Sequence, residues 1–204
     1  MEIKLLTNKK IFASNCYAIL SDGTFSVVDP SVSYSEALEI IPELKDMKHG
    51  CVLLTHGHLD HLWEIESYCE RGFEVFVSSE DAKLLSDPIG NCSYILRGPM
   101  NQFNGKVTEA LDGEVVSVGG GQSFRVMKTP GHTAGSVTYL GDTVAFTGDT
   151  LFARGTYGRC DLVSSDYRMM AKSLESLLKL NEAIIIYPGH GEISTIGETK
   201  SYFR

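Results

Sequence analysis

The chain has 204 residues, and its 43% content of hydrophobic residues is enough to fill a sizeable core, so we expect one domain spanning residues 1–204. Its 18 basic residues against 26 acidic ones give a net charge of −8, and the basic residues do not cluster. That balance argues against nucleic acid or an anionic membrane as a partner.

The N-terminus lacks a basic segment followed by an apolar core, and no apolar run reaches the length of a membrane span. The 5 cysteines are an odd number without paired spacing, which is typical of reduced thiols rather than of a disulfide framework. These features together predict a cytoplasmic protein.

Periodicity and turn residues predict two kinds of region in the first half of the chain. Three short strands come first, at residues 2–7, 11–20 and 24–29, and form an antiparallel meander. Strands and helices then alternate. The alternating elements are a helix at 35–44, capped by Ser33 or Ser35, a strand at 51–54, a helix at 62–71, a strand at 73–77 and a short helix at 79–86.

Residues 87–105 interrupt this alternation with glycine, asparagine and proline among scattered aromatic residues. Such a long irregular segment inside a compact domain is usually functional or disordered, and we interpret this one as a candidate lid.

Residue patterns alone predict a mixed α/β domain. The remaining predicted elements are strands at 114–118, 123–128, 136–140 and 143–147, a helix at 165–180 and a strand at 183–187.

A dense motif of metal-ligating residue types, H-x-H-x-D-H, directly follows the predicted strand that ends at residue 54. The two-residue spacing lets His56 and His58 point the same way from extended backbone, while Asp60 and His61 face a second point. The alternative is that Asp60 merely caps the following helix and the histidines are polar loop residues. That alternative fits each residue alone but not all four together.

Two further histidines, His132 and His190, each follow an apolar run and a Pro-Gly turn, and Asp149 also stands at the end of an apolar run. If the motif supplies two ligands to each of two ions, His132 would complete one set and His190 the other. Each set then has three ligands and open positions, as catalytic sites do. Asp149 could bridge the ions, and a water shared by two metals is activated for hydrolysis. The two sets are His56, His58 and His132, and Asp60, His61 and His190.

These motifs, in this order, resemble those of the metallo-beta-lactamase superfamily. The resemblance covers nearly the whole chain, from Asn-Cys-Tyr at 15–17 to Ser-Thr-Ile-Gly-Glu at 194–198. Within the superfamily the chain is most similar to the glyoxalase II (hydroxyacylglutathione hydrolase) branch, especially its short bacterial members. The resemblance is carried by H-x-H-x-D-H at 56–61, Thr-Pro-Gly-His-Thr-Ala-Gly-Ser at 129–136, Gly-Asp-Thr-Leu-Phe at 148–152 and Pro-Gly-His-Gly at 188–191.

The resemblance implies a four-layer αββα sandwich with a binuclear metal centre at one edge of the two sheets. It implies two divalent ions per chain, with Zn expected first and Fe or Mn as alternatives, since imidazole with carboxylate suits each of them. It further implies hydrolysis of a thioester such as S-lactoylglutathione by a metal-bridging hydroxide, which Asp60 would orient. Lactamases of this superfamily lack the bridging aspartate, so Asp149 argues against β-lactam hydrolysis.

Two features separate this chain from the long glyoxalase II enzymes and leave other activities open. Only residues 191–204 follow the last ligand, so we expect no C-terminal helical domain to bind glutathione. The segment 155–161, Gly-x-x-Gly-Arg-x-Asp, also resembles persulfide dioxygenases, which hold one iron through the equivalents of His56, His132 and Asp149. The alternatives are therefore a mononuclear-iron persulfide dioxygenase, a metallo-hydrolase of another ester or phosphodiester, and a regulatory protein that binds the metals without turnover.

Three residues outside the ligand sets are candidates for supporting roles with a small-molecule substrate. Arg159 could hold a substrate carboxylate, although an arginine so close to Asp161 is at least as often its structural partner. Tyr157 would line the same wall. Asp29 could orient a ligand histidine from behind, although Asp-Pro after a strand also simply makes a turn. The sequence predicts no oligomeric state.

Overall fold

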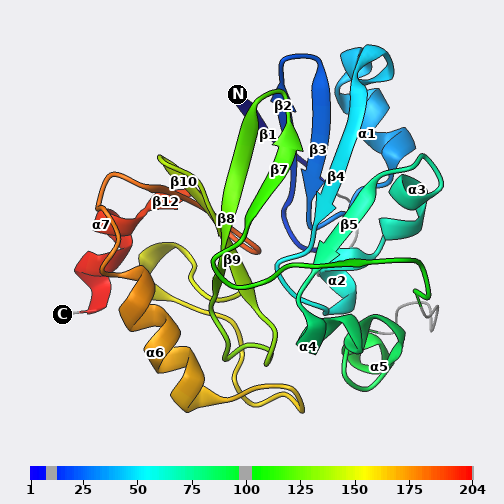
Figure 1. The fold of residues 1–204 in the computed structure, drawn as a ribbon. Helices are drawn as coiled ribbons and strands as arrows, with labels where there is room; N and C mark the ends of the chain where they lie inside the picture. The colour runs from blue at the N-terminus through cyan, green and yellow to red at the C-terminus, as the bar shows by residue number, and fades with distance from the viewer. Residues whose placement is uncertain (8–12, 97–102, 204) are drawn as a thin grey trace.

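Two β-sheets face each other, and helices cover their outer faces (Figure 1). The computed structural model describes residues 1–7, 13–96 and 103–203. Within these ranges each sheet has 6 strands, in the orders β1-β2-β3-β4-β5-β6 and β12-β11-β10-β9-β8-β7. This arrangement is the αββα sandwich that the resemblance implied, formed in a single α/β domain.

The N-terminal half of the chain forms the first sheet. Strands β1, β2 and β3 pair antiparallel, which confirms the predicted meander, and β3 to β6 run parallel. Residues 11 and 12 of the strand predicted at 11–20 lie outside the described residues, and β2 begins only at Cys16. The strands are β1 (Glu2–Leu6), β2 (Cys16–Ser21), β3 (Thr24–Val28), β4 (Lys48–Leu53), β5 (Glu74–Val77) and β6 (Thr108–Glu109).

The second sheet contains the five later strands that the sequence predicted, each within two residues of its expected bounds. β7 to β10 pair antiparallel in chain order, β11 runs parallel to β10, and β12 closes the edge. The two-residue strand β12 is too short to produce a periodic signal. The strands are β7 (Val115–Gly119), β8 (Gln122–Lys128), β9 (Val137–Leu140), β10 (Val144–Gly148), β11 (Ile185–Pro188) and β12 (Ser194–Thr195).

The four predicted helices are all shorter than expected. The helix predicted at 35–44 is α1 (Tyr34–Ile40), which Ser33 caps through a capping box with Glu36, and a separate 3-10 turn, η1 (Pro42–Asp46), follows it. Pro42 has no amide proton to continue the helical hydrogen bonds, so the helix ends before it. The helix predicted at 62–71 is wrong in its start, because the chain forms α2 (Leu59–Leu62) and then α3 (Ile65–Cys69).

The later helices cover the outer faces of the sheets or border the loops. None of the helices in the described ranges has both the length and the apolar character needed to cross a bilayer. α6 occupies only residues 167–177 of the helix predicted at 165–180, and Asp166 caps it. The helix predicted at 79–86 is divided into a helix at 79–82 and a 3-10 turn at 84–86. These elements are α4 (Ser79–Ala82), η2 (Leu84–Ser86), α5 (Ser93–Leu96), η3 (Ala153–Gly155), α6 (Tyr167–Leu177), α7 (Ile196–Lys200) and η4 (Ser201–Phe203).

Alternation along the central strands divides the core into layers. In β2, Tyr17 and Ile19 face the second sheet. The alternate residues of the strand, Cys16, Ala18 and Leu20, face the helices α1 and α3. Tyr17 meets Phe146 of β10 between the sheets, with the ring centroids 5.6 Å apart. On the far side, α6 packs against the second sheet through its buried residues Met170 and Leu174. The helices and sheets therefore bury apolar surface on every internal face, the main source of the fold's stability.

Residues 87–96, the described first part of the candidate lid, form turns that end in α5. The backbone N–H of Leu59 donates to the carbonyl of Asn91 at 2.9 Å, so this segment is attached to the start of α2. Residues 97–102 of the predicted lid lie outside the described residues. The segment borders the loop that carries the H-x-H-x-D-H motif at 56–61, which we call the motif loop. Closure of the segment over the motif loop stays a prediction.

A buried hydroxyl joins the two sheets at a distance from the predicted site. Ser26 of β3 is 0% exposed, donates to the carbonyl of Val118 in β7 at 2.8 Å and accepts from the backbone N–H of Cys51 at 2.9 Å. Both backbone groups lose a partner if this hydroxyl is removed.

We expect Ser26→Ala to lower the free energy of unfolding by about 1–3 kcal/mol, the cost of leaving buried polar groups unpaired. Urea unfolding would show this as a lower midpoint with an unchanged slope. The control Ser123→Ala, on the exposed face of β8, should change the unfolding free energy by less than about 0.5 kcal/mol. Equal effects of the two substitutions would contradict the inter-sheet role of Ser26.

Candidate metal centre

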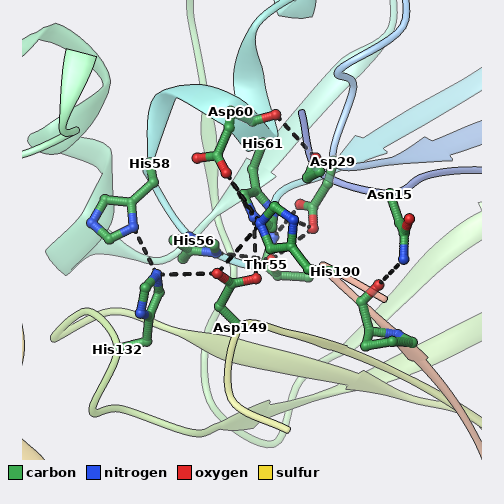
Figure 2. A network of polar contacts seen from close by, with 12 residues as sticks. Asn15, Asp29, Thr55, His56, His58, Asp60, His61, His132, Asp149 and His190 are labelled. Atoms are coloured by element: carbon green, nitrogen blue, oxygen red, sulfur yellow. Dashed lines mark hydrogen bonds and ion pairs between the residues drawn. The ribbon is translucent and has the colours of Figure 1, made fainter. Parts of the chain in front are cut away.

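Strand direction brings four ligand-bearing segments to one edge of the sandwich. These segments follow β4 in the first sheet and β8, β10 and β11 in the second. The last three strands run in one direction, because β8 and β10 both pair antiparallel with β9 and β11 pairs parallel with β10. The loops that follow these strands therefore emerge together, and their side chains point toward one another (Figure 2). All seven predicted ligands meet there, in groups whose candidate ligand atoms lie within 4.8 Å of one another: His56, His58, Asp60, His61, His132, Asp149 and His190.

The motif loop contributes side chains to more than one group of candidate ligand atoms. His58 is the extended residue before α2, and Asp60 and His61 stand on the first turn of that helix. His61 nevertheless lies beside His56, with the ring centroids 4.0 Å apart, and these two residues form a further group of candidate ligands with Asp149. Asp60 lies within the helix and does not cap it, so the alternative interpretation of this residue does not describe the structure.

The first group consists of His56, His58 and His132, and it joins the motif loop of one sheet to a loop of the other. The Nδ1 atom of His58 lies 2.8 Å from Nε2 of His132, and the ring of His56 lies beside both, with centroid distances of 4.8 and 4.7 Å. The Nδ1–H of His132 donates to the carbonyl of Arg159 at 2.8 Å. The opposite ring nitrogen of His132, Nε2, is therefore the one that faces His58 and His56.

The second group contains Asp60, His61 and His190. Oδ2 of Asp60 lies 3.1 Å from Nε2 of His190 and 3.8 Å from Nε2 of His61. The Nδ1–H of His61 donates to Oδ2 of Asp29 at 2.8 Å, behind the group. Asp29 thus contacts a candidate ligand histidine from the position that the sequence analysis proposed for it.

Asp149 lies between the two groups. Its Oδ2 atom is 3.4 Å from Nε2 of His132 and 3.6 Å from Nε2 of His190, and its Oδ1 atom is 3.2 Å from Nε2 of His61. Glycine at position 189 permits this packing, because a Cβ there would lie 2.2 Å from Oδ1 of Asp149. The carboxylate is therefore placed to contact an ion in either group.

Several polar atoms at the centre have no hydrogen-bond partner within the described part of the chain: Nε2 of His56, Nε2 of His61 and Oδ1 of Asp149. The Nδ1–H of His56 donates to the hydroxyl of Thr55 at 3.1 Å, and that hydroxyl donates to Asp29 at 2.8 Å. Unpaired buried polar atoms are costly. Because the outer ring nitrogens of His56, His61 and His132 each contact a fixed acceptor, their inner nitrogens are oriented as the ligands of a divalent metal ion would be.

The electrostatics of the site favour the forms that bind metal. Burial lowers the pKa of His56, and burial together with the neighbouring His132 lowers the pKa of His58 to about 3, so both rings are neutral at pH 7. Burial alone would raise the pKa of Asp149, but the charges of His61 and His132 outweigh it and hold that pKa well below the usual range. The carboxylate is therefore ionised.

Carboxylates lie on several sides of His61 and raise its pKa, and the hydrogen bond to Asp60 and the charge of Asp149 also raise the pKa of His190 against the effect of burial. Burial acts to lower the pKa of His61, but Asp29, Asp149 and Asp60 outweigh burial and raise it. A proton on His61 then compensates the carboxylates in the free protein. A divalent ion bound among these ligands would supply the positive charge in place of the proton on His61, which would then be released.

A cavity of about 330 Å³ opens onto the centre, with His58, Asp60, His132, Asp149 and His190 at its base. Its other lining residues are mostly apolar. They are Cys92, Ile95, Leu96, Phe152, Tyr157, Gly158, Arg159 and Leu162.

The predicted substrate residues Tyr157 and Arg159 both lie on this wall. The guanidinium of Arg159 makes two hydrogen bonds of 2.9 Å to the carboxylate of Asp161, which is the structural pairing that the sequence left open. Phe152 and Leu96 also line the cavity and were not singled out from the sequence. Isolated apolar residues in loops carry no signal that distinguishes a cavity wall from ordinary packing.

The comparisons with known proteins agree with this geometry. The family model of the metallo-beta-lactamase superfamily matches residues 10–190. Hydroxyacylglutathione hydrolase GloC from Haemophilus influenzae is 34% identical over 195 residues, which cover 93% of this chain and 91% of GloC. Among solved structures, BLEG-1 B3 metallo-beta-lactamase aligns with a TM-score of 0.86 and 28% identity over 98% of this chain and 97% of that one. TTHA1623 in a di-iron-bound form aligns with a TM-score of 0.79 and 25% identity over 92% of each chain.

We expect the metal-free protein to bind two equivalents of Zn per chain and His58→Ala to bind one, because only the first group loses a ligand. Equilibrium dialysis followed by elemental analysis measures this ratio. His49→Ala is the matched control, since His49 is an exposed histidine that contacts Tyr34 and Arg71 and none of the ligands. Two equivalents bound by His58→Ala would refute the assignment of the first group.

Proposed function

Because this chain belongs to the metallo-beta-lactamase superfamily, we propose that it is a metal-dependent hydrolase that cleaves thioesters such as S-lactoylglutathione at a binuclear centre. We propose two divalent ions per chain, Zn in the first instance with Fe or Mn as alternatives. The proposal includes a small-molecule substrate, no nucleic-acid or membrane partner, and a location in the cytoplasm. The five cysteines, all unpaired, are compatible with that location.

The observation that carries the proposal is the position of Asp149 between two groups of three ligands beside an open cavity. A structural metal site is normally closed by four protein ligands, whereas a catalytic one keeps a position for water or substrate. Two neighbouring groups joined by one carboxylate would hold a pair of divalent ions. Such a pair, when bound, activates water as a nucleophile and polarises the oxygen of the bond under attack.

The protein's own residues would position the reactants. Burial acts to raise the pKa of Asp60, but the charge of His61 and the hydrogen bond from His190 lower it, so the carboxylate is ionised and can accept a hydrogen bond from the attacking water. We propose that Asp60 orients this water toward the carbonyl carbon. The apolar side chains of Ile95 and Phe152 would exclude other water from the cavity.

A thioester suits this site because the departing sulfur needs little help. A thiol has a pKa of about 8.5, so it leaves as a thiolate without a general acid beside it. The 34% identity with hydroxyacylglutathione hydrolase GloC from Haemophilus influenzae supports the choice of a glutathione thioester as the first substrate to test. The likeness to BLEG-1, which is called a B3 metallo-beta-lactamase, makes a β-lactam a necessary comparison substrate.

We expect protein loaded with Zn, Fe or Mn to consume S-lactoylglutathione, measured by loss of thioester absorbance. His58→Ala should lower kcat by roughly 10²–10³-fold or more, the range for loss of an electrostatic stabiliser of a transition state. Circular dichroism should show an unchanged fold, and His49→Ala should keep wild-type activity. Near wild-type activity of His58→Ala would rule out the proposed mechanism.

Lack of turnover with every metal would also overturn the thioesterase proposal, and the same samples then distinguish the alternatives. Dioxygen uptake with glutathione persulfide in the iron-loaded protein would indicate a persulfide dioxygenase. Cleavage of a phosphodiester, another ester or a β-lactam would indicate a different hydrolase. Metal binding without any turnover would indicate a regulatory protein.

Arg159 and Tyr157 are the proposed contacts to the substrate beyond the ligands. If the exposed guanidinium of Arg159 leaves Asp161 to bind a glutathione carboxylate, Arg159→Gln should raise KM for S-lactoylglutathione about fivefold with little change in kcat. KM for a thioester without carboxylates should not change. Arg125→Gln, at an exposed position on β8, is the control, and a KM effect that is the same for both substrates would assign Arg159 a structural role only.

A further inference from the structure

A second buried carboxylate, Asp81, lies behind the first ligand group. It stands in α4 and is 0% exposed. The sequence analysis did not single it out, because an aspartate three residues after Ser78 is typical of an ordinary helix start. Ser78 does cap α4, by accepting from the backbone N–H of Asp81 at 3.3 Å. The carboxylate itself is directed elsewhere.

The two oxygens of Asp81 accept hydrogen bonds from both loops that form the first group. Oδ2 accepts from the backbone N–H of Gly57 at 2.8 Å and from the hydroxyl of Thr133 at 2.6 Å. Oδ1 accepts from the backbone N–H of Gly135 at 2.9 Å. Gly57 stands between His56 and His58, and Thr133 follows His132 directly. One carboxylate therefore connects ligand loops that belong to different sheets.

The backbone of both ligand loops approaches Asp81 closely at Gly57 and Gly135. A Cβ at position 57 would lie 2.9 Å from the carbonyl oxygen of Asp81, and one at position 135 would lie 2.5 Å from Oδ1 of Asp81. The hydroxyl of Ser78 donates to the carbonyl of Gly135 at 2.6 Å. Glycine at both positions lets the two loops reach the start of α4, so their separation is set by contacts to one rigid element.

Asp29 makes the corresponding contacts on the other side of the motif loop. It accepts from the backbone N–H and the hydroxyl of Thr55, each at 2.8 Å, and from Nδ1–H of His61 at 2.8 Å. The motif loop is therefore held from both sides by buried carboxylates. Asp29 contacts a candidate ligand directly, whereas Asp81 contacts only the backbone and hydroxyl groups next to the ligands.

We propose that Asp81 is a positioning residue that fixes the distance between the motif loop and His132, and so sets the metal affinity of the first group without much effect on the second. This inference rests on the proposed metal centre but not on thioester hydrolysis. Without the carboxylate, two backbone N–H groups and one hydroxyl lose their acceptor. The close approach of His58 to His132, 2.8 Å between ring nitrogens, then loses the contacts that maintain it.

The test measures Zn affinity in two backgrounds, each of which leaves one group complete. In His190→Ala, where the second group is incomplete, Asp81→Asn should weaken Zn binding about 10- to 100-fold, the range for groups that support metal ligands. In His58→Ala, where the first group is incomplete, the same substitution should weaken Zn binding less than about threefold. Competition titration with a chromophoric chelator gives both affinities, and Asp142→Asn, at an exposed turn, should have no effect in either background.

Equal weakening in both backgrounds would show that Asp81 supports the fold as a whole, and no weakening in either would show that it does not position the loops; both results overturn the inference. Because the readout is metal binding, a failure to hydrolyse thioesters would not affect the result. If Asp81→Asn does not fold, Thr133→Val in the His190→Ala background replaces it. That variant should weaken Zn binding several-fold while Thr133→Ser keeps the affinity, and equal affinities of the two would overturn the inference.

Discussion

The proposed centre depends on the direction in which each buried histidine donates its ring proton. His61 donates to the carboxylate of Asp29, His132 to a backbone carbonyl and His56 to the hydroxyl of Thr55. With those donors satisfied at the outside of the cluster, the remaining nitrogen of each ring presents a lone pair to the inside. A divalent cation bound inside the cluster would take these nitrogens as ligands, so the contacts that orient the rings also prepare the site for metal.

The sandwich makes this arrangement possible because parallel strands end at the same edge. The motif loop follows β4 of the first sheet, while the loops of His132, Asp149 and His190 follow β8, β10 and β11 of the second (Figure 2). The apolar layer between the sheets holds these strands in register. Function is therefore placed on loops, and precision comes from the rigid strands and from α4 behind them.

Family membership and fold narrow the chemistry but do not by themselves name the substrate. Metal ligands are shared by proteins with different activities, whereas the cavity wall differs from one to another. In this chain the wall is largely apolar, and Arg159 binds Asp161. We therefore propose that residues of the cavity wall, such as Tyr157, select the substrate rather than the ligands themselves.

The sequence by itself determined which residue types stand at the strand ends and that four candidate ligands lie within one short motif at 56–61, because residue spacing is a local property of the chain. Only the tertiary structure decided which distant residue joins which pair: His132 lies 74 residues from His58 in sequence yet 2.8 Å away in space. The tertiary structure also showed that Asp29 accepts a hydrogen bond from His61 and that Asp81 accepts hydrogen bonds from two of the ligand loops. No local pattern could show these contacts, because they depend on the packing of separate strands and helices.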